Sequence, residues 1–245
     1  GDRALAAAFD YNAKIKKTPI VVKDVRGFFT NRVFPPYMGE AMKLVTEGVK
    51  PDLIENAAKS LGMPIGPLAL LDETTLQLGY DVMQSTKKEL GDAYQPSGTE
   101  DFMELMVVKL GRKGRRFGSG FYDYDEKGER LTLWQGMADH YPLAENQPTV
   151  EEVKQRLLYI QLIATAQCFE EEVVRDPQSA DLGAIFGWGF APYTGGPMSY
   201  IDTVGLENFV RTADSLAQRF GSRFAPPKSF REMADTGATL YKAAA

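Results

Sequence analysis

The chain has 245 residues, of which 44% are hydrophobic and 25% charged, the composition of an ordinary globular protein. Its length suits one large domain or two small ones. The net charge of -5 gives no reason to expect nucleic acid as a partner. The sequence contains no run of about 18 apolar residues, so no membrane span is predicted. With one cysteine, Cys168, and one histidine, His140, the sequence excludes an internal disulfide and a zinc site of the ordinary ligand type.

The ends of the sequence show no targeting signal. Residues 1–4 lack the pattern of a signal peptide, and the last residues are not a peroxisomal address. We therefore expect a cytoplasmic protein.

The N-terminal segment predicts a helix followed by a strand. Residues 3–17 are rich in alanine, which favours a helix, and residues 20–22 are a β-branched run typical of a strand. A strand needs partners, and the sequence contains no βαβ series that could supply them. We expect residues 1–23 to be the terminal helix and strand of a truncated NAD-binding domain.

From Gly27 onward the pattern becomes helical. Apolar residues recur every three or four positions, as on one face of a helix, and Pro35 and Pro36 within this run predict a kink or a late start. A strand-like piece around residues 120–124, a turn and a possible return strand at residues 131–133 follow. The further predicted helices cover residues 52–61, 67 to about 90, 101–110 and 149 to about 174, and Thr149 is predicted to be the N-cap of the last one.

The second half of the sequence repeats the first. The pair Gln155-Arg156 echoes Asn31-Arg32, and residues 196–202 echo residues 66–72. Two copies of one helical unit indicate a pseudo-symmetric, all-α body. The predicted boundaries are a first repeat at residues 24–130, a linker at 131–148 and a second repeat at 149–245.

Several short strings in the first repeat resemble the C-terminal region of the 3-hydroxyacyl-CoA dehydrogenases. In this order and spacing they span about residues 18–124, and the second copy resembles the extra repeat of multifunctional β-oxidation enzymes. The resemblance implies two tandem helical units of the 6-phosphogluconate dehydrogenase C-terminal-like fold. The strings are Asp24-x-x-Gly27-Phe28-x-x-Asn31-Arg32, Tyr37-x-x-Glu40-Ala41, Glu47-Gly48, Gly62-x-Pro64-x-Gly66-Pro67-x-x-x-x-Asp72 and Gly118-x-Gly120-Phe121-Tyr122.

The family resemblance also implies an activity and its partners. The family oxidises a (3S)-3-hydroxyacyl-CoA with NAD, using a histidine and a glutamate of a Rossmann domain that would precede residue 1. The Gly-x-Gly-x-x-Gly loop of that domain is absent from the sequence, so we expect the chain alone to be inactive and to bind no NAD. The implied partners are an acyl-CoA substrate, the Rossmann domain of the parent chain, and a second copy of the chain or a thiolase subunit.

Asn31 is the one catalytic residue that the resemblance implies for this segment. Its carboxamide would hold the C3 oxygen of the substrate by a hydrogen bond that does not depend on pH. The alternative is that Asn31 caps the helix that follows. For Arg32 we expect a structural ion pair with Glu40 or Asp72.

The basic loop offers candidate contacts to coenzyme A. Lys109, Arg112 and Lys113 could approach its phosphates, although a solvated loop is the alternative. Asp72 and Asp202 occur in both copies, which favours a structural role such as helix capping. The acidic run at residues 170–172 is predicted to be a solvated face.

Two other functions remain open at this point. One is a non-catalytic helical scaffold or interaction module, which would not bind acyl-CoA. The other is a different NAD(P)-dependent dehydrogenase with a helical second domain, against which the duplication and the 120–122 strand argue.

Overall fold

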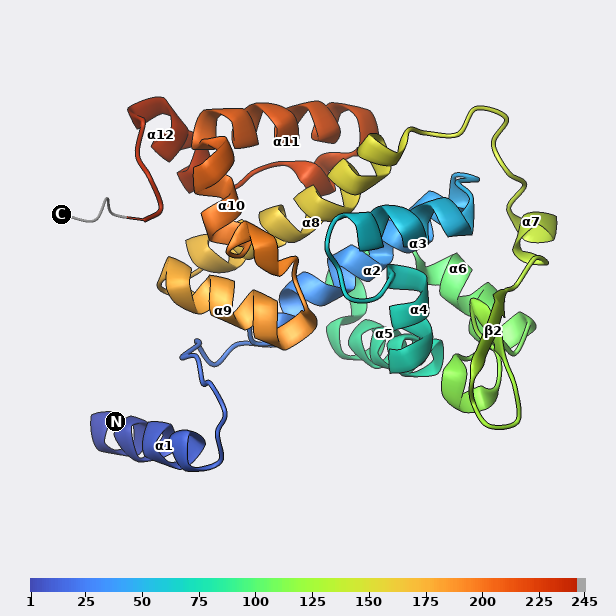
Figure 1. Ribbon diagram of the computed structural model, residues 1–245, viewed down its shortest axis with the longest axis horizontal. Coiled ribbons are helices and arrows are strands. Elements are labelled where there is room, and N and C mark those ends of the chain that lie inside the picture. The colour runs from blue at the N-terminus through green and yellow to red at the C-terminus, as the bar shows by residue number, and fades with distance from the viewer. Residues whose placement is uncertain (242–245) are drawn as a thin grey trace.

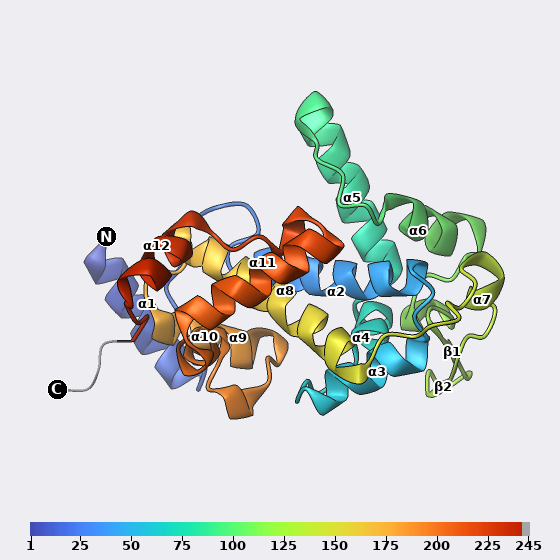
Figure 2. The same ribbon diagram turned by 90° about the horizontal axis from the view of Figure 1, so that it is seen from above.

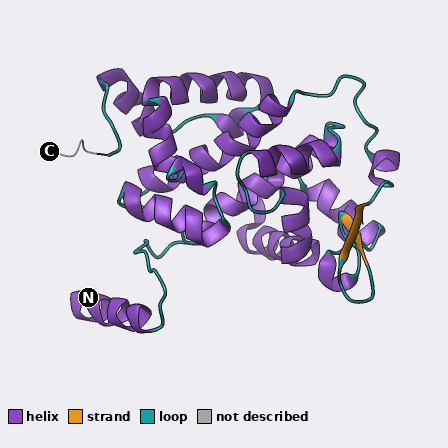
Figure 3. Ribbon diagram, viewed as in Figure 1, coloured by secondary structure: helices purple, strands orange, loops and turns teal. Residues whose placement is uncertain are grey.

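The structure of the protein is a computed structural model that describes residues 1–241 (Figures 1 and 3). Helices dominate it, and its strands form one antiparallel hairpin. The strands are β1 (Tyr122–Tyr124) and β2 (Arg130–Leu133). The helices are α1 (Asp2–Lys14), α2 (Thr30–Thr46), α3 (Pro51–Ser60), α4 (Pro67–Thr74), α5 (Leu76–Leu90), α6 (Glu100–Glu104), α7 (Met137–His140), α8 (Val150–Glu170), α9 (Pro177–Trp188), α10 (Pro197–Val204), α11 (Leu206–Phe220) and α12 (Lys228–Thr236).

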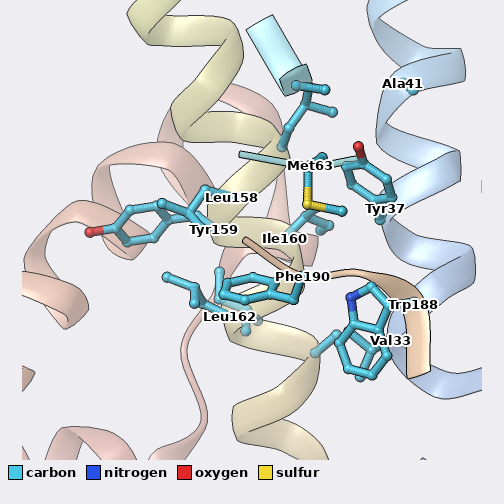
Figure 4. Packing of buried hydrophobic residues seen from close by; sticks show 14 of the residues in the cluster. Val33, Tyr37, Ala41, Met63, Leu158, Tyr159, Ile160, Leu162, Trp188 and Phe190 are labelled. Atoms are coloured by element: carbon cyan, nitrogen blue, oxygen red, sulfur yellow. The ribbon is translucent and has the colours of Figure 1, made fainter. Parts of the chain in front are cut away.

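Two helical units share one core. The first unit contains α2 to α6 and the hairpin, the second contains α8 to α12, and the long helices α2 and α8 pack against each other between them (Figures 1 and 2). Figure 4 shows Val33 and Tyr37 of α2 in one buried cluster with Ile160 and Leu162 of α8 and Trp188 of α9. The buried apolar side chains of both units form a single cluster, which stabilises the units together.

The helices of the second unit repeat those of the first, which confirms the predicted all-α duplication. Helices α4 and α10 have the same length and begin at Pro67 and Pro197, and α5 and α11 also match in length. The glycine before each proline is needed because a buried carboxylate, Glu55 or Asp181, lies where a Cβ atom would be.

The first long helix begins earlier than its prolines suggested. Helix α2 starts at Thr30 and includes Pro35 and Pro36, so the late start does not occur. Pro35 and Pro36 are the sixth and seventh residues of the helix, beyond its first four N–H groups, so each removes a hydrogen bond within the helix. The buried face of α2 against α8 offsets this loss.

The predicted N-terminal strand does not form within residues 1–241. Val22 makes only an isolated antiparallel bridge with Val174, and Lys23 donates its backbone N–H to the carbonyl of Val173 at 2.9 Å. Within residues 1–241, the turn after α8 is the only distant part of the backbone to which this segment is hydrogen-bonded. Helix α1 stands apart from the body in Figure 1, and none of its thirteen residues is buried.

Other boundaries also differ from the predictions. The single helix expected from residue 67 to about residue 90 is broken at Thr75, whose φ of 65° is not helical. The helix at 101–110 changes to a π-helical turn at Leu105–Lys109, and the linker contains the short helix α7. The hairpin and the N-cap at Thr149, whose hydroxyl accepts from the N–H of Glu152, are confirmed.

Among the helices of residues 1–241, none combines the length and the apolar character that a membrane crossing requires.

Candidate functional site

Asn31 lies at an exposed turn at the start of α2. Gly27 and Phe28 both have positive φ, 80° and 49°, and they turn the chain so that the N–H of Asn31 bonds to the carbonyl of Gly27 at 3.2 Å. The N-cap of the helix is Phe29, so Asn31 does not cap it. The residue is exposed, and the part of the chain that the structure describes offers its carboxamide no hydrogen-bond partner.

Arg32, the next residue, reaches into the second unit. It pairs with Glu171 at the end of α8, which agrees with the predicted structural ion pair, although its carboxylate partner is neither Glu40 nor Asp72. Glu40 instead bonds to two other arginines, Arg156 and Arg223. The prediction that residues 170–172 form a solvated face is confirmed, because all three are exposed, and Glu171 makes its ion pair from this exposed position.

The segment before α2 also contacts α5. Arg26 pairs with Glu89 at 3.0 Å and donates to the hydroxyl of Thr86 at 3.0 Å. Helix α5 projects from the body (Figure 2) and presents Leu78 and Val82, which are more than half exposed, as is Phe28. Apolar side chains that could contact an aliphatic ligand are therefore exposed on both elements that Arg26 joins.

The three basic candidates have separate partners. Arg112 donates to the carbonyls of Gly120 and Tyr122 at 2.6 and 3.1 Å and to the Asp123 carboxylate at 2.6 Å. Lys113 lies 5.7 Å from the ring of Phe117. Lys109 is exposed, 3.9 Å from the carboxylate of Glu104. Arg112 therefore holds the hairpin, whereas the ammonium group of Lys109 is exposed to solvent.

Buried carboxylates organise each unit around its Gly-Pro turn. In the first unit Glu55 accepts from the N–H groups of Leu68 and Ala69 at the start of α4. Asp72 accepts from the N–H groups of Phe121 and Tyr122, both at 2.8 Å. Burial raises the pKa of Asp72 to about 6 despite these bonds.

The second unit repeats this arrangement. Asp181 accepts from Met198 and Ser199 at the start of α10, and Asp202 accepts from the N–H groups of Leu240 and Tyr241. The duplicated aspartates are structural, as expected, but the backbone N–H groups that they accept from lie outside helices. Sequence reasoning missed Glu55 and Asp181, because a buried cap far from its helix in sequence has no local signature.

Residues 1–241 do not contain a Rossmann fold. Their strands form an antiparallel hairpin, whereas a dinucleotide fold needs parallel strands with a glycine-rich turn into a helix. No cluster of three or more potential metal-ligating side chains occurs within residues 1–241. His140 lies on α7 beside Trp134, across the first unit from the start of α2 (Figures 1 and 2).

Comparison with known proteins identifies relatives of both units. Residues 27–124 match the family of 3-hydroxyacyl-CoA dehydrogenase C-terminal domains. The chain is 35% identical over 243 residues to the fatty acid oxidation complex subunit alpha of Shewanella loihica, and 36% identical over 241 residues to that of Shewanella halifaxensis. These alignments cover 98% and 97% of the chain but only 34% and 33% of the relatives, so the chain spans about a third of their length.

Solved structures share the fold. A 3-hydroxybutyryl-CoA dehydrogenase from Escherichia coli matches 93% of this chain and 64% of its own with a TM-score of 0.69 at 19% identity. The dehydrogenase part of multifunctional enzyme 1 from C. elegans matches 94% of this chain and 53% of its own, also with a TM-score of 0.69, at 27% identity. Residues 27–124 thus belong to the 3-hydroxyacyl-CoA dehydrogenase C-terminal domain family, and the chain as a whole is related to the alpha subunits of fatty acid oxidation complexes.

Proposed function

We propose that the chain is the substrate-binding and dimerisation region of an NAD-dependent (3S)-3-hydroxyacyl-CoA dehydrogenase of fatty acid β-oxidation. The observation that carries the proposal is Asn31, an exposed carboxamide in the Asp24-x-x-Gly27-Phe28-x-x-Asn31-Arg32 string at the start of a helix. The two fatty acid oxidation subunits related to the chain support it.

Asn31 would bind the oxygen on C3 of the substrate. Its N–H2 group can donate to a hydroxyl before oxidation and to a carbonyl afterwards, without a change of protonation. The partial positive charge at the first turn of α2 adds to the stabilisation of negative charge on that oxygen. The exposed Phe28, Leu78 and Val82 would contact the acyl chain, and Lys109 a phosphate of coenzyme A.

The remaining functions of the active site would come from another part of the parent protein. Hydride transfer needs a bound nicotinamide and a base. Residues 1–241 contain no Rossmann fold to bind the nicotinamide, and their histidine, His140, lies across the first unit from Asn31. We propose that a Rossmann domain supplies both and that the chain alone has no turnover.

A chimera tests the role of Asn31. The aligned third of the Shewanella loihica subunit would be replaced by this chain, and NADH oxidation by acetoacetyl-CoA would be measured. Asn31→Ala is expected to lower kcat/KM by roughly 100- to 1,000-fold, the usual effect of removing one hydrogen bond to a developing negative charge.

The matched control is Gln155→Ala, at the position in the second unit that corresponds to Asn31. Its activity should equal that of the unchanged chimera. An active Asn31→Ala chimera would contradict the proposal. If the chain neither binds acetoacetyl-CoA nor supports activity in the chimera, the scaffold function is favoured instead.

A further inference from the structure

We propose that Glu171, in the second unit, is a positioning residue that holds Asn31 in place through Arg32. The inference rests on the proposed function for Asn31, but the contacts that carry it are structural and can be tested without a substrate.

The first observation is that Glu171 has a counterpart in the first unit. Glu47 follows the last residue of α2, and Glu171 follows the last residue of α8. The same sequence spacing separates Arg32 from Glu47 and Arg156 from Glu171. The two helices thus carry the same arginine and glutamate at matching positions.

The second observation is that these residues pair across the two units rather than within one. Arg32 of α2 pairs with Glu171 of α8. Arg156 of α8 pairs with Glu47 of α2, with 2.8 Å between Nη2 and Oε1. Each arginine therefore contacts the glutamate that follows the other long helix and not the one that follows its own, which is the reciprocal pattern of a two-fold interface.

The third observation is that the two pairs differ in their support. Arg156 is almost fully buried, and it also donates to Glu40 at 2.6 Å and lies 4.2 Å from the ring of Phe220. The side chain of Arg32 is 28% exposed, and within residues 1–241 its only ion-pair partner is Glu171. Loss of Glu171 therefore releases Arg32, whereas loss of Glu47 leaves Arg156 held.

Arg32 is in turn coupled to the turn that presents Asn31. Its Cγ lies 3.3 Å from the place where a Cβ would stand on Gly27, so its aliphatic part packs over the turn. Just beyond Glu171, the carbonyl of Val173 accepts from the N–H of Lys23 at 2.9 Å. The end of α8 thus contacts the chain on both sides of the turn, and Glu171 pairs with the residue that directly follows Asn31.

The experiment reads the state of Asn31 directly by NMR of the full chain labelled with ¹⁵N and deuterium. Asn31→Ser identifies the side-chain amide resonance. Glu171→Gln is expected to shift this resonance and to speed hydrogen exchange at the N–H groups of Asn31 and Arg32 about threefold, because an exposed ion pair makes a modest contribution.

Two further variants distinguish positioning from general stability. The exchanged pair Arg32→Glu with Glu171→Arg should restore the resonance and the exchange rates, and Glu47→Gln should leave both unchanged. An unshifted Asn31 resonance in Glu171→Gln, or an equal shift in Glu47→Gln, overturns the proposal. Because no ligand is present, failure of the function proposed for Asn31 would appear in the chimera and not in this measurement.

Discussion

Thr75 adopts a backbone conformation that glycine adopts at the matching position of the second unit. Its φ and ψ are 65° and 126°, and those of Gly205 are 84° and 138°. A β-branched residue is strained with a positive φ. The hydroxyl of Thr75 offsets part of this strain, since it accepts from the N–H of Leu78 at 3.2 Å.

Thr75→Gly is therefore expected to stabilise the protein slightly. Relief of about 1–3 kcal/mol of strain exceeds the loss of a cap and the greater entropy of the unfolded glycine chain, which together cost about 1 kcal/mol. The thermal midpoint should rise by roughly 2–4 °C. Gly205→Thr is the reverse control and should lower it; a lower midpoint for Thr75→Gly would show that the cap dominates.

Asp72 is fully buried, and its carboxylate accepts two backbone N–H groups and the hydroxyl of Tyr124 at 3.0 Å. Burial disfavours the charge more than these three bonds favour it, so the pKa rises from 3.8 to about 6. Between these two values the folded state binds more protons than the unfolded state. The contribution of Asp72 to stability therefore decreases as the pH rises from about 4 to 6, by on the order of 3 kcal/mol.

A ¹³C NMR titration of the folded chain should place the midpoint of the Asp72 carboxyl near pH 6. Tyr124→Phe removes a hydrogen bond to the charged form, so this variant should raise the midpoint further. A midpoint below 4 in the unchanged chain would mean that the hydrogen bonds prevail over burial.

At the scale of helices and strands, periodicity and turn residues were sufficient to predict most of the structure. The apolar face of α2, the Gly-Pro starts of α4 and α10 and the Thr149 cap are local patterns, and the structure has all of them. The break at Thr75 was not predictable, because threonine is not a signal for a positive φ. The bridge between Val22 and Val174 depends on a contact between distant segments, which single-sequence patterns do not contain.

The candidate site shows the same contrast between local sequence patterns, which can be predicted, and contacts between distant segments, which cannot. Asn31 could be proposed from the sequence because its neighbours form a recognisable string, and the structure places it exposed at the start of α2. The partner of Arg32 was missed because Glu171 lies in an acidic run that is typical of a solvated face. Its pairing follows from how α8 packs on α2, so it required the structure of both units.

At the scale of the whole molecule, a buried charge network joins the two units. Glu40 of α2 is fully buried and accepts from Arg156 of α8 and from Arg223 after α11, both at 2.6 Å. Arg156 also bonds to Glu47, whose side chain is 42% exposed. Removing one member of such a network leaves a buried charge without its full set of partners.

Replacing Glu40 alone should therefore cost more than replacing Glu40 and Arg156 together. Glu40→Met leaves the buried Arg156 guanidinium with Glu47 only, and we expect a loss of about 3 kcal/mol and a thermal midpoint lower by roughly 6–12 °C. In Glu40→Met with Arg156→Met, Glu47 and Arg223 can reach water and the apolar side chains can pack on Phe220, so the loss should be smaller. A double-mutant cycle with Glu40→Met, Arg156→Met and the double variant, followed by thermal unfolding, measures the coupling between Glu40 and Arg156. If the losses of Glu40→Met and Arg156→Met simply add in the double variant, Glu40 and Arg156 do not act as a unit in joining the two repeats.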